Sequence, residues 1–132
     1  MTEIHLLCGV PGSGKTWVAR QLKHYAYVPH DDYPVAEYHN ALVKAAMTSK
    51  LPVVGEAPFR IQVLVDQLRM KGVKVTTYYI TDSEPTIKFQ YERRTKKAWP
   101  AQHSNNLKRY DQRKSWDHRG TSKYILSLLE SK

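Results

Sequence analysis

The sequence contains a single cysteine, Cys8, among its 132 residues. One cysteine excludes an internal disulfide and any metal site built from several thiolates, and its place in an apolar run predicts a buried, unreactive thiol. No apolar run approaches the roughly 18 residues that a membrane span needs. The N-terminus also lacks the basic and apolar regions of a secretory signal. We therefore expect a cytoplasmic protein that makes no use of a membrane.

Acidic residues are scarce in the C-terminal third of the chain. The net charge is +9, and between Arg93 and Lys123 ten lysines and arginines stand against two acids, Asp111 and Asp117. The remainder of the sequence is therefore close to neutral. A concentrated positive charge attracts polyanions, and either a nucleotide or a nucleic acid would satisfy it. The length allows one domain, residues 1–132, with one core.

Apolar segments of strand and helix character alternate along the chain. The pattern predicts strands at residues 3–8, 25–28, 51–54 and 73–80, each followed by a segment with helical spacing of apolar residues. The helices are expected at about 15–24, 34–49, 58–71 and 82–95, and the last thirty residues read as polar and helical. This alternation predicts an α/β domain: a short parallel sheet of about four strands flanked by helices, with a helical, basic C-terminal third.

A glycine-rich segment follows the first expected strand. Gly9-Val-Pro-Gly-Ser-Gly-Lys-Thr16 fits the pattern G-x-x-x-x-G-K-[ST] at every position. Glycines let successive backbone N–H groups turn inward toward an anion, and the following helix adds its positive N-terminal end. The segment therefore predicts a phosphate-binding loop (P-loop) for ATP, with Lys15 on the β- and γ-phosphates and the Thr16 hydroxyl on Mg²⁺. The residues expected to bind the nucleotide are Gly9, Pro11, Gly12, Ser13, Gly14, Lys15 and Thr16.

Three carboxylates follow the next two strands. Asp31 and Asp32 come after the second strand, and Glu56 after the third. Because the carboxyl ends of parallel strands meet at the ligand crevice, these groups are expected near the phosphates. Asp31 is the better candidate for a catalytic base, since Asp32 could instead cap the helix expected from Pro34. Glu56 is a candidate Mg²⁺ ligand through water, although a simple loop carboxylate would have the same sequence.

Two adjacent arginines, Arg93 and Arg94, close the fourth expected helix. Basic residues at a helix end are favourable with the helix dipole alone. Two arginines before a polar, proline-broken segment are also typical of a kinase lid, in which a cation neutralises the transferring phosphoryl group. We therefore expect a lid at about residues 93–103, and a P-loop NTPase of the kinase type as the fold.

Three segments resemble the 5′-kinase domain of bacteriophage polynucleotide kinase: residues 9–20, 30–33 and 93–100. The resemblance follows the same order of elements over about residues 3–115. It implies that Lys15 and Thr16 contact ATP and Mg²⁺, and that Asp31 activates the acceptor hydroxyl. The sequence departs from the family at Trp17, where a hydroxyl residue is usual, and at Pro34, where an arginine is usual.

The resemblance also implies that Arg93 or Arg94 is the lid cation and that a nucleic-acid hydroxyl, possibly at a 5′ end, accepts the phosphoryl group. The basic third contains Trp99, Tyr110 and Trp116 among its cations, which suits single-stranded nucleic acid, although these aromatic residues could equally belong to the core. Three alternatives stay open: a kinase of hydroxymethylated bases in DNA, a nucleoside or nucleotide kinase, and a regulatory module that binds ATP without catalysis.

Overall fold

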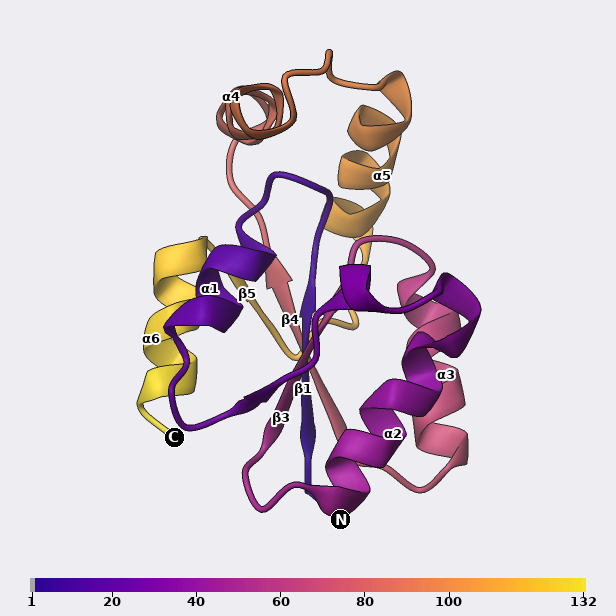
Figure 1. The fold of residues 1–132 in the computed structure, drawn as a ribbon. Helices are drawn as coiled ribbons and strands as arrows, with labels where there is room; N and C mark the ends of the chain where they lie inside the picture. Colours follow the sequence, from indigo (N-terminus) through magenta and orange to yellow (C-terminus); the bar gives the residue numbers. More distant parts are fainter. Residues whose placement is uncertain (1) are drawn as a thin grey trace.

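The computed structural model describes residues 2–132 and shows one parallel sheet between two layers of helices (Figure 1). The sheet has five strands in the order β2-β3-β1-β4-β5, and every neighbouring pair is parallel. The strands are β1 (Ile4–Cys8), β2 (Ala26–Tyr27), β3 (Val53–Ala57), β4 (Val75–Ile80) and β5 (His118–Gly120). The fold is therefore the single-domain α/β fold that the alternating pattern predicts.

Two pairs of helices cover the sheet, and a third pair stands above its carboxyl edge (Figure 1). Helices α1 (Lys15–Gln21) and α6 (Ser122–Glu130) lie on one face, while α2 (Tyr38–Thr48) and α3 (Ile61–Met70) lie on the other. Helices α4 (Glu84–Thr95) and α5 (Ala101–Gln112) form the upper pair. Across residues 2–132, no helix combines the length and the apolar character needed to cross a bilayer.

The central strand β1 supplies both layers of the core. Its residues Ile4 and Leu6 are buried with α2 and α3, whereas Leu7 is buried with α1 and α6. Burial on both faces is the usual state of a parallel strand between helical layers. A third, smaller cluster of Val10, Ile87 and Leu107 packs the loop after β1 against α4 and α5. The upper helices are thus attached directly to the P-loop.

The structure adds one strand to the four that the sequence predicts. β5 consists of His-Arg-Gly, which has no apolar alternation, so the C-terminal third is two helices joined through a strand rather than a helical segment throughout. The preceding residue, Asp117, accepts hydrogen bonds from the backbone N–H (2.8 Å) and the hydroxyl (3.1 Å) of Thr77. These partners are 40 residues apart, so the pairing leaves no local sign in the sequence.

The third strand extends further than its sequence predicts. β3 continues through Gly55 and Glu56, and α3 then starts at Ile61 rather than at Pro58. Gly55 does not end the strand, because it is needed for packing: a Cβ there would lie 2.6 Å from a Leu42 methyl and 2.9 Å from the Tyr38 hydroxyl. The extension places the Glu56 carboxylate on a rigid strand.

Other helix ends move by a few residues. The helix expected from Pro34 begins with a 3₁₀ turn at Val35–Glu37 before α2, and α1 ends at Gln21 rather than near His24. The side chain of Ser83 caps α4 by accepting from the backbone N–H of Thr86. Such shifts are usual where several residues near a helix start can cap it.

The hydroxyl of Tyr38 joins β3 to the segment after β2. It donates to the Val28 carbonyl (2.6 Å) and accepts from the Glu56 N–H (2.9 Å), and the Tyr38 side chain is fully buried. We predict that Tyr38→Phe lowers the free energy of unfolding by about 1–3 kcal/mol, since two buried polar groups lose their partner. Urea unfolding measures this, with the exposed Tyr124→Phe as a control. Equal losses in the two variants would contradict the role of the Tyr38 hydroxyl.

Candidate nucleotide and phosphoryl-transfer site

The loop between β1 and α1 is held in a tight turn by glycines with positive φ. Gly12 (φ 93°) packs against α4, where a Cβ would meet the Ile87 carbonyl and the Tyr91 side chain at 2.9 Å. Gly14 (φ 107°) leads directly into α1. A side chain at Gly12 would force α4 away, so the turn and its contact with the upper helices require glycine.

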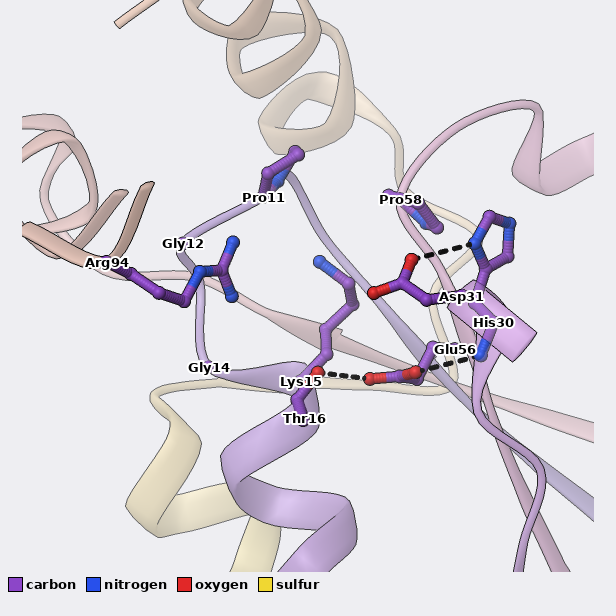
Figure 2. A pocket seen from close by; sticks show the side chains of 10 residues that line it. All are labelled: Pro11, Gly12, Gly14, Lys15, Thr16, His30, Asp31, Glu56, Pro58 and Arg94. Atoms are coloured by element: carbon purple, nitrogen blue, oxygen red, sulfur yellow. Dashed lines mark hydrogen bonds and ion pairs between the residues drawn. The ribbon is translucent and has the colours of Figure 1, made fainter. Parts of the chain in front are cut away.

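The backbone N–H groups of this loop are available to a ligand. Within residues 2–132, those of Gly12, Gly14, Lys15 and Thr16 have no hydrogen-bond partner, and all four residues line one pocket. The pocket also contains the lysine and an arginine, and α1 points its N-terminus at it (Figure 2). These unpaired donors and cations fit the polyphosphate of a nucleotide.

Lys15 is buried in the loop that precedes it. Its ammonium donates to the carbonyls of Gly9 (2.8 Å) and Val10 (2.9 Å), with the Ser13 hydroxyl at 3.5 Å. Burial lowers the pKa of Lys15 to about 8, although the nearby Glu56 carboxylate opposes the shift. The cation is therefore already desolvated, which strengthens its interaction with a phosphate.

Thr16 and Glu56 form a hydrogen-bonded pair at the bottom of the pocket. The Thr16 hydroxyl donates to Glu56 Oε1 (2.7 Å), and the His30 backbone N–H donates to Oε2 (3.1 Å) (Figure 2). Residues 2–132 contain no group of three or more His, Cys, Asp or Glu side chains that could bind a metal ion without further ligands. A hydroxyl and one carboxylate fit Mg²⁺, which commonly uses one or two protein oxygens together with phosphates and waters.

The two adjacent aspartates point in different directions in the structure. The 3₁₀ turn His30–Asp32 directs the Asp31 side chain into the pocket beside Lys15, while Asp32 does not line it. The Asp31 carboxylate is fully exposed, and its one ion pair within residues 2–132 is with His30 Nδ1 at 3.8 Å. Asp31 is thus free to accept a proton from a group that enters the pocket.

Only one of the two adjacent arginines lines the pocket. Both arginines are exposed, but Arg94 lines the pocket opposite Asp31 and the neighbouring Arg93 does not (Figure 2). The connection that follows is packed rather than loose: the Trp99 indole N–H donates to Ser104 Oγ (2.7 Å), and the Trp99 backbone N–H donates to Glu92 (3.1 Å). That the segment around residues 93–103 moves as a lid stays a prediction.

The aromatic residues of the basic third, Trp99, Tyr110 and Trp116, pack against other residues of the chain. Trp116 stacks on Tyr79 (ring centroids 4.9 Å apart) and donates to the Tyr110 carbonyl, and the Tyr110 hydroxyl donates to the Pro58 carbonyl (3.1 Å). Trp99 packs against Tyr91 and His103. These three aromatic residues therefore belong largely to the core and to the joint between helices, which is the alternative that their sequence left open.

Several pocket residues were not identified from the sequence. His30 and Pro58 line the same pocket, and a second hollow on the other side of the loop is lined by residues that include Trp17, Arg20, Gln90, Ser122 and Lys123. Both hollows share Gly12, Gly14, Thr16, Asp31 and Arg94. No motif marks these positions, because His30 and Pro58 follow β2 and β3 while the others come together from α1, α4 and the start of α6.

Solved structures with the same fold include phosphotransferases. A gluconokinase from Sinorhizobium meliloti matches with a TM-score of 0.68 and 16% identity, over 98% of this chain and 90% of that one. The tunicamycin resistance protein of Deinococcus radiodurans matches with a TM-score of 0.78 and 12% identity, over 99% and 95%. The APS kinase of Mycobacterium tuberculosis, solved with AMPPNP and APS, matches with a TM-score of 0.56 and 15% identity, over 98% and 98%.

No family model matches the sequence, and comparison with curated proteins gives no match. At these identities the structural matches establish the fold, which is that of the P-loop NTPases in the form that small kinases share. They cover nearly all of this chain and nearly all of each matched chain. The fold that the P-loop motif predicts is thereby confirmed, while the acceptor is a separate question.

The lowered pKa of Lys15 predicts the pH dependence of nucleotide binding. Because the protonated ammonium is the form that attracts phosphate, affinity for a non-hydrolysable ATP analogue should fall as pH rises through about 8. Calorimetric titration from about pH 7 to about pH 10 measures the dissociation constant, and ordinary exposed lysines stay charged over most of this range. Lys15→Ala should bind weakly and show no such inflection. A wild-type affinity that is flat across this range would contradict the assignment.

Proposed function

We propose that the protein is a kinase that transfers the γ-phosphoryl group of ATP to a hydroxyl of a nucleic acid. The observation that carries the proposal is the exposed Asp31 carboxylate, which shares a pocket with Lys15, Arg94 and the Thr16–Glu56 pair. A module that only senses ATP needs the P-loop but has no use for an exposed carboxylate and an arginine placed across from it. The arrangement therefore supports catalysis over regulation.

Each residue has a distinct part in this reaction. The unpaired N–H groups of the loop and Lys15 would hold the β- and γ-phosphates. Thr16 with Glu56 would hold Mg²⁺, which would offset phosphate charge. Asp31 orients the acceptor hydroxyl and takes its proton as the oxygen attacks phosphorus. Arg94 lies where negative charge on the transferring group would be stabilised. The bond from phosphorus to the ADP oxygen then breaks, and ADP leaves.

A second candidate is a kinase of small acceptors such as nucleosides or nucleotides. Two of the matched proteins are named for kinases of gluconate and APS, and the internal packing of Trp99, Tyr110 and Trp116 removes one argument for a nucleic acid. The C-terminal third contains ten cations and only two acids. This positive charge is larger than one bound nucleotide requires, so the charge distribution favours a nucleic acid as the acceptor. Hydroxymethylated bases in DNA are an acceptor of the same polyanionic class.

The paired residues provide matched tests of the catalytic roles. We predict that Asp31→Asn lowers kcat by at least about 10²-fold, the usual effect of removing a general base, whereas Asp32→Asn leaves it nearly unchanged. Arg94→Ala should lower kcat by about 10²–10³-fold, the usual effect of losing a charge-stabilising donor, and Arg93→Ala should have little effect. Steady-state kinetics with the best acceptor measures all four variants. Equal losses within either pair would refute the corresponding role.

The acceptor is identified by a transfer assay. Wild-type protein, Mg²⁺ and γ-labelled ATP are incubated with 5′-hydroxyl oligonucleotides, DNA with hydroxymethylated bases, nucleosides and nucleoside monophosphates, with Lys15→Ala as the control. We expect label in an oligonucleotide, absent with Lys15→Ala. Label confined to nucleosides or monophosphates would establish the second candidate, and no transfer despite ATP binding would contradict kinase activity itself.

A further inference from the structure

A basic groove lies between the start of α3 and one side of α5. Five of its residues come from Phe59 to Val63, and the others recur along α5 at helical spacing: Gln102, Asn106, Arg109, Tyr110 and Arg113. The set contains three arginines and three side-chain amides, and it includes no carboxylate. Neither the P-loop nor the proposed catalytic residues take part in it. Its chemistry is therefore that of a separate site for an anion.

The backbone at the start of α3 adds donors to this groove. Within the described residues, the N–H groups of Ile61, Gln62 and Val63 have no hydrogen-bond partner, and no acidic residue occurs in the first turn of the helix. Arg60, directly before the helix, is held at φ 51°, a conformation uncommon for residues other than glycine. A helix start that is neither capped nor balanced by an acid favours a negatively charged ligand.

The side chains of the groove are partly fixed and partly free. Arg113 is held in place, since its guanidinium donates to Gln62 Oε1 (2.7 Å) and lies over the Trp116 ring (4.4 Å). Arg60 and Arg109, by contrast, make no ion pair or side-chain hydrogen bond with any residue from 2 to 132. Asn106 is only 6% exposed; its Oδ1 accepts from Gln102, while its amide nitrogen, which reaches solvent, has no partner among residues 2–132. One solvent-accessible amide donor and two guanidinium groups, all without partners among the described residues, thus line one groove.

The groove adjoins the Asp31 side of the catalytic pocket. Pro58 lines that pocket, the next residue, Phe59, lines the groove, and the Tyr110 hydroxyl fixes the segment through the Pro58 carbonyl. Phe59 is 45% exposed, so part of its ring is open to solvent. Cations beside an accessible aromatic ring are the pattern that binds single-stranded nucleic acid, the cations taking phosphates and the ring a base.

We infer that this groove binds phosphodiester groups of the acceptor strand, next to the nucleotide whose hydroxyl is phosphorylated. Arg60, Arg109 and the α3 N–H groups take the phosphates, and Phe59 stacks on a base. The inference rests on the proposed function, because the groove is assigned to the acceptor on account of its position beside Asp31. Binding of a strand to the groove does not itself require phosphoryl transfer. The phosphate of a small phosphorylated acceptor could bind the groove through the same contacts. The effect of acceptor length on binding distinguishes such a small acceptor from a nucleic-acid strand.

The test uses a double variant and a control of equal charge. Arg60→Gln/Arg109→Gln removes the two free guanidinium groups, and Lys44→Gln/Arg69→Gln removes two exposed cations elsewhere on α2 and α3. Each protein is assayed with 5′-hydroxyl strands of one to about eight nucleotides and with a nucleoside 3′-monophosphate. Binding of a fluorescent strand is measured in parallel at several salt concentrations, without ATP.

We expect the wild-type KM to fall as the acceptor grows beyond one nucleotide. The groove variant should lose this length dependence, with KM for longer strands raised about 10-fold or more and KM for ATP unchanged, because charged hydrogen bonds to phosphate are lost. Its log–log salt slope for binding should decrease by about 0.7 for each phosphate contact removed. The control should behave as wild type.

The outcomes separate this inference from the proposed function. Strand binding that is lost in the groove variant, with no phosphoryl transfer by wild type, would support the groove and refute the kinase. Transfer that is equally length-dependent in wild type and the groove variant would support the kinase and refute the groove. If a nucleoside 3′-monophosphate binds with full affinity and further nucleotides add nothing, the groove does not bind a strand. This result would overturn the inference in favour of a small phosphorylated acceptor.

Discussion

The carboxylate of Glu56 is the point at which the sheet, the P-loop and the segment bearing Asp31 are joined. It accepts from the Thr16 hydroxyl at the start of α1 and from the His30 backbone N–H, while the Glu56 N–H donates to the Tyr38 hydroxyl from α2. Three elements that diverge from the sheet therefore meet at one buried residue, two of them at its carboxylate and one at its backbone N–H. Because hydrogen bonds to a buried carboxylate are costly to leave unmade, this arrangement fixes the distance between the phosphate-binding loop and Asp31. It also explains why β3 continues through Gly55 and Glu56: a residue on a loose loop could not hold two partners with its carboxylate and a third with its backbone N–H at once.

A compact P-loop must also keep a desolvated cation in place. Lys15 is stabilised by the carbonyls of Gly9 and Val10, yet burial still lowers its pKa to about 8. The loop thus holds its lysine at some cost to the folded state, since a buried ammonium is less stable than a hydrated one. The close contact between Gly12 and α4 has a related consequence, because the helix that carries Arg94 is packed directly on the loop. Cation and loop therefore approach any phosphate as one preorganised unit, which is what electrostatic stabilisation of a transferring group requires.

The sequence predicts those parts of the site that are contiguous, and misses those that depend on side-chain direction or on distant pairing. The P-loop was predictable because eight adjacent residues determine its geometry. The sequence favoured Asp31 over Asp32 only because Asp32 could instead cap a helix, and it could not distinguish Arg94 from Arg93. Successive residues point about 120° apart in a 3₁₀ turn and about 100° apart in an α-helix. Which member of each pair faces the pocket depends on the rotation of the element, which packing decides. β5 was missed for a different reason, since three residues without alternation pair only with a strand some 40 positions away.

The location of the positive charge bears on the choice of acceptor. A kinase that phosphorylates an uncharged alcohol has to neutralise one polyanion, and the loop N–H groups, Lys15 and Arg94 are sufficient for that. A kinase whose acceptor is itself a polyanion has to bring two negative groups into contact, so cations are needed on both sides of the reacting atoms. Here Arg20 and Lys123 line the hollow on one side of the P-loop, and Arg60, Arg109 and Arg113 line the groove beyond Asp31. Cations therefore lie in the hollow beside the P-loop and in the groove beyond Asp31, which is the distribution that the proposed polyanionic acceptor would require.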